Sequence, residues 1–300
     1  MEQVAEGFQL LEGPVWDERR GLLFADAEGG GVYSLRDGRV STVVPHRRGI
    51  GGMALHADGG LIVGGRNLAY KGAAGEETLV LVDNDVATSA QVGFSDIVSS
   101  PKGQVYAGTL GSRPDPSGHV ARGGGLYLID LDGSCRAVIP SPQVRHTNGL
   151  GFSPDGTHLY YADSGPKTVF RYRVEPDGSL TDKHAFATFE QGIPDGLAVA
   201  SDGSVWVAGC FAGSVLVYEP TGALRRKIPV PVNIVTNVCF GGAELCDVYI
   251  TTGSLDPSKR EGRVFHMAGA IPGVPVAPAR IPIDRSRPAP CLPGSRGEGS

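Results

Sequence analysis

The chain has 300 residues, of which 41% are hydrophobic, and this is enough for one large folded domain or two ordinary ones. Its 27 basic and 32 acidic residues give a net charge of −5, which excludes the basic surface typical of proteins that bind nucleic acid or anionic membranes. No apolar run is long enough to span a membrane, and the amino terminus lacks the basic and then apolar order of a signal peptide. We therefore expect a protein of the cytoplasm.

The composition is rich in residues that form turns. The 45 glycines and 22 prolines favour many short strands and tight turns over long helices. The five cysteines are odd in number and show neither metal-ligand nor paired spacing, so we expect neither a structural zinc nor a disulfide framework. They lie at Cys135, Cys210, Cys239, Cys246 and Cys291.

A turn followed by a short aliphatic strand recurs six times along the chain. The turns end 38 to 53 residues apart, at Gly21, Gly59, Gly103, Gly156, Gly203 and Cys246. A period of about 40–50 residues built from strand, Asp-Gly turn and strand is typical of propeller blades. We therefore predict an all-β fold, a six-bladed β-propeller.

Each turn is preceded by a segment of small and apolar residues, as expected for strands that crowd a central axis. These inner segments are residues 12–16, 51–55, 95–99, 148–152, 195–199 and 236–240. A third strand of each blade is predicted at residues 31–35, 78–83, 125–130, 168–174, 214–220 and 263–268.

The two ends of the chain have different expected roles. Residues 4–10 can supply the missing fourth strand of the last blade, which would close the ring and remove its exposed sheet edges. Residues 1–268 are thus predicted to form a single propeller. Residues 269–300 are rich in Pro, Gly and Arg, and we expect a tail that is wrapped around the propeller or disordered.

The first residues of the six inner segments should ring one end of the central channel. Two carboxylates, one amide and two hydroxyls facing a common axis would repel one another without a cation. Hard oxygen donors favour Ca²⁺ most, with Mg²⁺, Mn²⁺ or Zn²⁺ as alternatives. The competing interpretation is a set of ordinary strand-end polar residues that face water. The ring consists of Glu12, Gly51, Ser95, Asn148, Asp195 and Thr236.

Five motifs in this order resemble the senescence marker protein/gluconolactonase family, also called regucalcin-like, over about residues 8–253. The motifs are EGPVW at 12–16, TNGLGFSPDG at 147–156, YYADS at 160–164, IPDGLAVASDG at 193–203 and NVCFGG at 237–242. The resemblance implies a six-bladed propeller with one divalent cation in its channel, held by Glu12, Asn148 and Asp195. It also implies that Asp195 is the general base. Enzymes of this family are mostly lactonases, with related phosphotriester hydrolases.

One departure from the family pattern affects the expected substrate. Sugar lactonases of the family carry Arg-x-Asn-Asp where this chain has Gly93, Phe94, Ser95 and Asp96. Ser95 replaces the amide beside the metal, and Gly93 replaces an arginine whose fork of donors suits polyols or carboxylates. We therefore expect a roomier, more apolar pocket and a substrate other than gluconolactone itself.

Further candidates surround the predicted opening of the channel. His146 could take or give a proton, or could be an ordinary loop histidine bonded to backbone. The polar insertion at 111–124 could cover the channel mouth, and its basic residues could replace the missing arginine, although a plain surface loop is an alternative. The expected substrate-binding residues are Ser95, Arg66, Asn67, His119, Arg122 and Phe211, with Arg113 and Tyr70 as further possibilities.

The sequence thus predicts a metal-dependent hydrolase that opens a small-molecule lactone or related ester, with the cation polarising the carbonyl and Asp195 as base. A non-hydrolytic enzyme acting on a specialised metabolite, such as a cyclase, isomerase or lyase, needs the same groups and stays open. A non-catalytic propeller that binds metal or a partner is the third reading. The sequence leaves the oligomeric state open.

Overall fold

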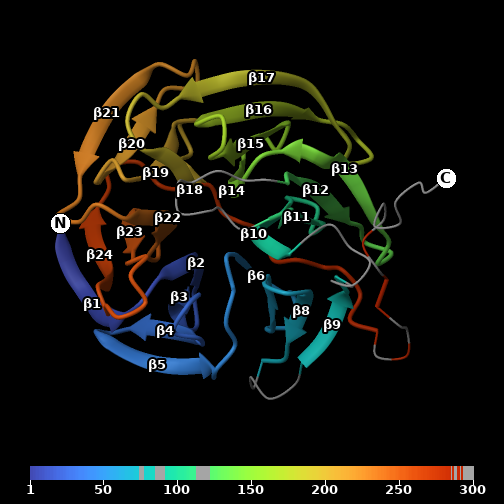
Figure 1. The fold of residues 1–300 in the computed structure, drawn as a ribbon, viewed down its shortest axis with the longest axis horizontal. Coiled ribbons are helices and arrows are strands. Elements are labelled where there is room, and N and C mark those ends of the chain that lie inside the picture. The colour runs from blue at the N-terminus through green and yellow to red at the C-terminus, as the bar shows by residue number, and fades with distance from the viewer. Residues whose placement is uncertain are drawn as a thin grey trace.

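The computed structural model describes residues 1–73, 78–84, 92–112, 122–284, 286, 289–290 and 292. These residues form 24 strands in six four-stranded antiparallel sheets, which stand as blades around a central axis (Figure 1). The predicted six-bladed β-propeller is confirmed. No helix of the length and apolar character that a membrane crossing requires occurs among the described residues.

The innermost strand of every blade coincides with one of the repeated small and apolar segments. The six inner strands are β2 (Leu11–Asp17), β6 (Met53–Leu55), β10 (Gly93–Ser99), β14 (Thr147–Phe152), β18 (Ile193–Val199) and β22 (Val235–Gly241). All six run in the same direction along the axis. We call the end where they begin the upper end, and the end where they finish the lower end.

The other strands follow outward in sequence order within each blade. The second strands are β3 (Gly21–Asp26), β7 (Leu61–Val63), β11 (Val105–Leu110), β15 (His158–Asp163), β19 (Val205–Cys210) and β23 (Asp247–Thr252). The third strands are β4 (Val32–Arg36), β8 (Leu68–Lys71), β12 (Gly124–Ile129), β16 (Thr168–Val174), β20 (Ser214–Tyr218) and β24 (Gly262–Ala268). The fourth are β5 (Arg39–Val44), β9 (Thr78–Val82), β13 (Cys135–Val144), β17 (Leu180–Thr188), β21 (Leu224–Pro229) and, for the sixth blade, β1 (Glu2–Phe8).

The ring is closed by the amino-terminal strand, as the sequence predicted. β1 pairs antiparallel with β24, with Glu2 opposite His266 and Phe8 opposite Gly262. The first and last parts of the propeller therefore share one sheet, and the sixth blade has four strands like the others.

The second blade differs from the sequence prediction in its third strand. Residues 78–83 were expected to form it, but β9 (Thr78–Val82) is the fourth strand and β8 (Leu68–Lys71) is the third. A strand of only four residues is too short to show the period-two pattern from which strands are predicted. Tyr70, expected near the upper opening, instead donates a hydrogen bond of 2.8 Å to Asp58 in the lower β6–β7 turn.

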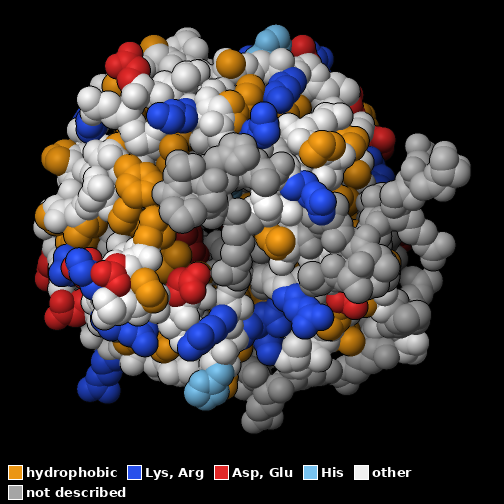
Figure 2. Space-filling view, in the orientation of Figure 1, with side chains coloured by type: hydrophobic (Ala, Val, Ile, Leu, Met, Phe, Trp, Pro, Cys, Tyr) orange, Lys and Arg blue, Asp and Glu red, His pale blue; other side chains and the backbone are white. Residues whose placement is uncertain are grey.

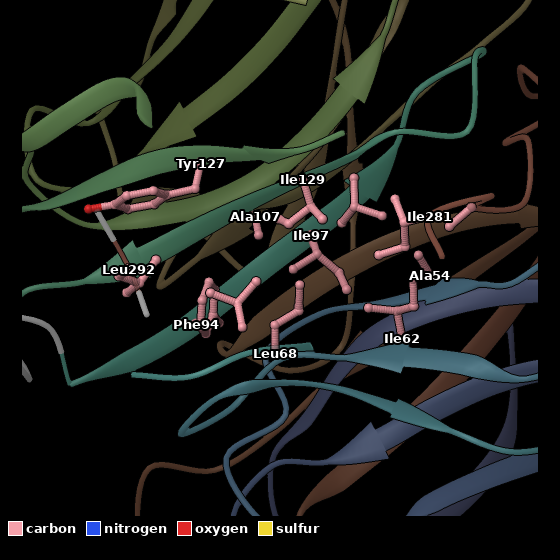
Figure 3. Packing of buried hydrophobic residues seen from close by; sticks show 13 residues of the cluster. Ala54, Ile62, Leu68, Phe94, Ile97, Ala107, Tyr127, Ile129, Ile281 and Leu292 are labelled. Carbon is pink, nitrogen blue, oxygen red and sulfur yellow. The ribbon is translucent and has the colours of Figure 1, made fainter. Parts of the chain in front are cut away.

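The carboxy-terminal segment packs against the blades where it is described. Ala279, Ile281 and Leu292 are fully buried in the hydrophobic cluster that the second and third blades share. Figure 3 shows Ile281 near Ala54, and Leu292 beside Tyr127.

The inner strands approach one another so closely that little room is left for side chains just below the upper end. A Cβ atom added to Gly149 would lie 2.4 Å from the backbone nitrogen of Leu197 and 2.7 Å from the carbonyl oxygen of Asp195. A Cβ on Gly52 would lie 2.4 Å from the nitrogen of Ile97. Both obstacles are backbone atoms of the next inner strand, so they cannot turn aside.

We predict that Gly149→Ala lowers the free energy of unfolding by about 2–3 kcal/mol, because the methyl group pushes β14 away from β18. Chemical denaturation measures the change. Gly151→Ala, on the same strand, is the matched control. Its Cβ would meet only the side-chain ends of Leu197 (2.8 Å) and Val199 (3.1 Å), which can shift, so a smaller loss is expected. Equal losses in the two variants would contradict the backbone contact.

Candidate functional site

The predicted metal ligands lie at the upper ends of three inner strands. Glu12 is the second residue of β2, Asn148 the second of β14 and Asp195 the third of β18. Asn148 and Asp195 are buried, and Glu12 is half-buried. The hydroxyl of Thr236, which was expected to face the axis, does not serve this ring: it donates to the carbonyl oxygen of Leu11 at 2.6 Å and so ties β22 to β2.

Burial and neighbouring carboxyl groups raise the pKa of the two acidic residues among the predicted ligands. Burial, followed by the negative charges of Asp195 and Asp96, raises the pKa of Glu12 well above its usual range. Burial and the charge of Asp96 do the same for Asp195, which accepts hydrogen bonds from the backbone N–H of Gly196 and from the Cys210 thiol. Both donors are neutral. Ionised carboxylates in such surroundings carry an electrostatic cost that a bound cation would remove.

A short hydrogen-bond chain fixes the Asn148 amide next to Asp195. Asn148 Nδ2 donates to Ser164 Oγ at 2.7 Å, and Ser164 Oγ donates to the carbonyl oxygen of Pro194 at 2.5 Å. Pro194 directly precedes Asp195. Since Nδ2 is engaged with Ser164, Oδ1 is the atom that the amide offers as a ligand.

This donor set fits a hard divalent cation. Two carboxylates and an amide oxygen are the oxygen ligands that Ca²⁺ and Mg²⁺ take in proteins. Among the described residues, no three His, Cys, Asp or Glu side chains gather closely enough to hold a metal by themselves. An ion between Glu12 and Asp195 would therefore depend on neutral oxygens such as that of Asn148 to complete its coordination.

Sequence reasoning did not assign three residues that the structure brings to this site. Asp96 follows Ser95 on β10, and burial raises its pKa to about 7. Asn237 Nδ2 donates to Asp96 Oδ1 over a long 3.5 Å. Cys210 ends β19 beside Asp195, and burial together with the charges of Asp195 and Glu12 raises the pKa of its thiol, which stays protonated. The one sequence signal for Asp96 was its place in the altered motif after Gly93.

His146 lies just before β14, two residues from Asn148. Its backbone N–H donates to Asp163 Oδ1 at 2.8 Å, and its carbonyl oxygen accepts from the Ser164 N–H at 3.0 Å. The residue is half-buried, and burial lowers the pKa of its imidazole, which is therefore neutral near pH 7. The proposed role in proton transfer stays a prediction.

The structure gives a physical reason for the glycine that replaces the family's arginine. The backbone of Phe94 exchanges two hydrogen bonds with Gly65 in the neighbouring blade, at 2.7 and 3.1 Å. A Cβ on Gly93 would lie 2.7 Å from the carbonyl oxygen of Gly65. This contact between blades leaves no space for a side chain at position 93. The buried Ser95 follows on the same strand.

The loop between β7 and β8 carries Arg66, which is exposed, and Asn67. Asn67 is engaged by a residue that sequence reasoning missed, because Arg47 donates to its backbone oxygen at 3.1 Å and to its Oδ1 at 3.0 Å. Arg48, beside Arg47, is exposed. Figure 2 shows Lys and Arg side chains gathered around the loops that lead into β6 and β8. Asn67 thus positions a basic group here.

The remaining predicted substrate residues differ in how they are held. Phe211 directly follows Cys210, is 47% exposed and has a φ of 64°, which is rare for a residue with a side chain. Arg122 is exposed, and its backbone N–H donates to Ser112 Oγ at 3.0 Å. His119 and Arg113 lie outside the described residues.

Fold and site together define a six-bladed propeller that gathers buried carboxyl groups at one end of its channel. Residues 10–254 match the model of the family described as "SMP-30/Gluconolactonase/LRE-like region", so the chain belongs to this family.

The similarity to named relatives covers most of the chain. Pentonolactonase XacC of Haloferax volcanii is 32% identical over 93% of this chain and 94% of its own length. The 6-deoxy-6-sulfogluconolactonase of Pseudomonas putida is 33% identical over 87% of this chain and 89% of its own. Among solved structures, XC5397 of Xanthomonas campestris, described as a gluconolactonase, has a TM-score of 0.73 at 26% identity and covers 90% of this chain and 88% of its own. The family resemblance and the predicted class, a hydrolase of the lactonase type, are confirmed.

The raised pKa of Asp96 predicts how Asp96→Asn changes the pH dependence of stability. The carboxyl titrates at about 7 when folded and near 4 when unfolded, so the folded state holds the proton more tightly. The stability that this group contributes is present at low pH and is lost as pH rises from about 4 to about 7. Asp96→Asn, measured with chelator by thermal unfolding, should gain stability relative to the unmodified protein from pH 5 to pH 8.

The control for this experiment is Asp202→Asn, which changes a turn carboxylate of the fifth blade. Its pKa is lowered, with the Ser204 hydrogen bonds and Arg225 opposing its burial, so it should show no relative gain in this window. A difference between Asp96→Asn and the unmodified protein that does not change with pH would show that Asp96 titrates normally.

Proposed function

We propose that this chain is a divalent-metal-dependent lactonase in which Asp195 is the general base. The observation that carries the proposal is the pair of mutually repelling carboxyl groups, Glu12 and Asp195, beside an amide whose nitrogen is already bonded. The lactonase names of the relatives support the same reaction.

Glu12, Asn148 and Asp195 are the residues that would hold the cation, and Ca²⁺ is the first choice because it accepts several oxygen ligands in flexible geometry. A divalent cation bound there would polarise the lactone carbonyl. Asp195 takes the proton from the attacking water, helped by the Gly196 N–H and the Cys210 thiol, which keep its carboxylate oriented.

The proton leaves with the ring oxygen of the lactone when the ester C–O bond breaks, so the product is a hydroxy acid. Neutral His146, two residues from Asn148, is the second group that we assign to proton transfer at the departing oxygen.

The substrate that we propose is a lactone with an apolar substituent and not gluconolactone itself. The contact between Gly93 and Gly65 removes the arginine fork that would recognise hydroxyl or carboxylate groups. Phe211, held at positive φ with almost half of its surface exposed, offers an aromatic surface next to Cys210. Strained residues of this kind concentrate at ligand sites.

Asp195→Asn should lower kcat for lactone hydrolysis by about 100-fold or more while the protein still folds, because it removes the base and weakens the metal site. Initial rates with the metal restored after chelation give the change, and circular dichroism checks the fold. Asp202→Asn is the matched control and should keep full activity. Full activity of Asp195→Asn would rule out the assigned base. Product formed in heavy-oxygen water should carry the label, whereas an unlabelled product of unchanged mass would indicate isomerisation.

Phe211→Ser should lower kcat/KM for a γ-lactone with an alkyl chain by about tenfold, because it removes an apolar surface worth roughly 1.5–3 kcal/mol on burial. The value for glucono-1,5-lactone should change little. Leu224→Ser, at another exposed apolar residue that starts β21, is the control. An equal loss for both lactones in Phe211→Ser would assign Phe211 a role in folding and not in selectivity.

A further inference from the structure

The central channel holds a cavity at its lower end, with a volume of about 540 Å³. The lower halves of all six inner strands line it, and its walls are mostly apolar, with Val15, Met53, Ile97, Leu197 and Val238 among them. This volume lies within the usual range for sites that bind small molecules.

A layer of close-packed residues separates this cavity from the carboxyl groups above. The cavity lining includes Asp96 and Asn237 but neither Glu12 nor Asp195. Asp96 and Asn237 face each other across the channel, and at this level glycines let neighbouring inner strands approach each other closely. Asp96, only 6% exposed, thus stands at the inner end of the lower cavity, where the Asn237 amide donates to it over a long 3.5 Å.

The carboxy-terminal segment Val274–Pro278 forms the other side of the cavity. The red segment crosses the middle of the ring in Figure 1. On one side Val274 N–H donates to the carbonyl oxygen of Val199 at 2.8 Å. On the other side, the Ala279 N–H donates to the carbonyl oxygen of Leu55 at 2.7 Å. Two of the five covering residues are prolines, which have no N–H that could be left unpaired against an apolar space.

Apart from Asp96, the acidic and basic side chains that line this cavity lie at its outer rim. Asp17 binds Arg20 at 2.6 Å, and the adjacent Glu18 and Arg19 are exposed to solvent. An anionic ligand would therefore meet no unpaired positive charge in the apolar walls, and its desolvation would be costly.

We propose that the lower cavity binds a neutral, mainly apolar small molecule that carries one hydrogen-bond donor, with the donor directed at the Asp96 carboxyl and the apolar body between the inner strands and Val274–Pro278. Mostly apolar walls favour a ligand with an apolar body, because binding removes apolar surface from water. The proposed ligand space lies below Glu12 and Asp195 and meets the lactonase centre only at Asp96, and the proposal does not depend on the assigned reaction.

The test uses N-phenyl-1-naphthylamine, a neutral aromatic amine with one N–H whose fluorescence rises in apolar surroundings. Titration of the full-length protein should give saturable binding of one probe per chain. Ala198→Phe, in the cavity wall, and Ala277→Phe, in the covering segment, should each weaken binding by about tenfold or more because the new ring occupies the space. Ala223→Phe, in the exposed β20–β21 turn, is the matched control and should bind as the unmodified protein does.

Lactone hydrolysis, measured in the same samples, separates this site from the upper one. Both cavity variants should keep their hydrolysis rate, and saturating probe should leave the KM for the lactone unchanged. Absence of saturable binding, equal affinity in Ala277→Phe and the control, or competition between probe and lactone would each overturn the proposal. Ala277→Phe lies outside the blades, so it carries the test even where Ala198→Phe fails to fold.

Discussion

The structure depends on the close approach of six inner strands to one axis. At Gly149 and Gly52 the backbone of one strand lies against the backbone of the next, with no room for a Cβ atom. The same crowding brings side chains from separate blades within reach of one another. Glu12 and Asp195 come from the first and fifth blades, yet their carboxyl groups lie close enough that ionising both carries an electrostatic cost. Tight packing thus concentrates the negative charge that a bound cation would neutralise.

This crowding also divides the channel into two environments. Above the layer of Asp96 and Asn237 the groups are oxygen-rich and acidic, and below it they are mainly aliphatic. Different connections complete the two ends: loops between blades surround the upper one, and the chain beyond the last blade covers the lower one. A change in the covering segment can therefore alter the lower cavity without moving the carboxyl groups.

Features that repeat along the chain could be predicted from the sequence. The inner segments recur six times, so the blade number and the equivalence of Glu12, Asn148 and Asp195 followed from alignment of the repeats. Features that arise between blades could not be predicted. The hydroxyl of Thr236 on β22 donates to the first blade, and the Asn237 amide of the same strand donates to Asp96 of the third blade. No pattern within a single repeat contains such contacts. The four-residue β8 was missed because it is too short to show periodicity.

The pairing of β1 with β24 has a consequence for how the molecule is made. The strand that completes the last blade is synthesised before the other five blades, and its partner, Gly262–Ala268, is synthesised after them. Until β24 has been synthesised, β1 has no neighbouring strand. The blades made by then form an open ring whose terminal sheets have exposed edges. The ring can therefore close only after β24 has been synthesised, and until then the first and sixth blades cannot stabilise each other through this shared sheet.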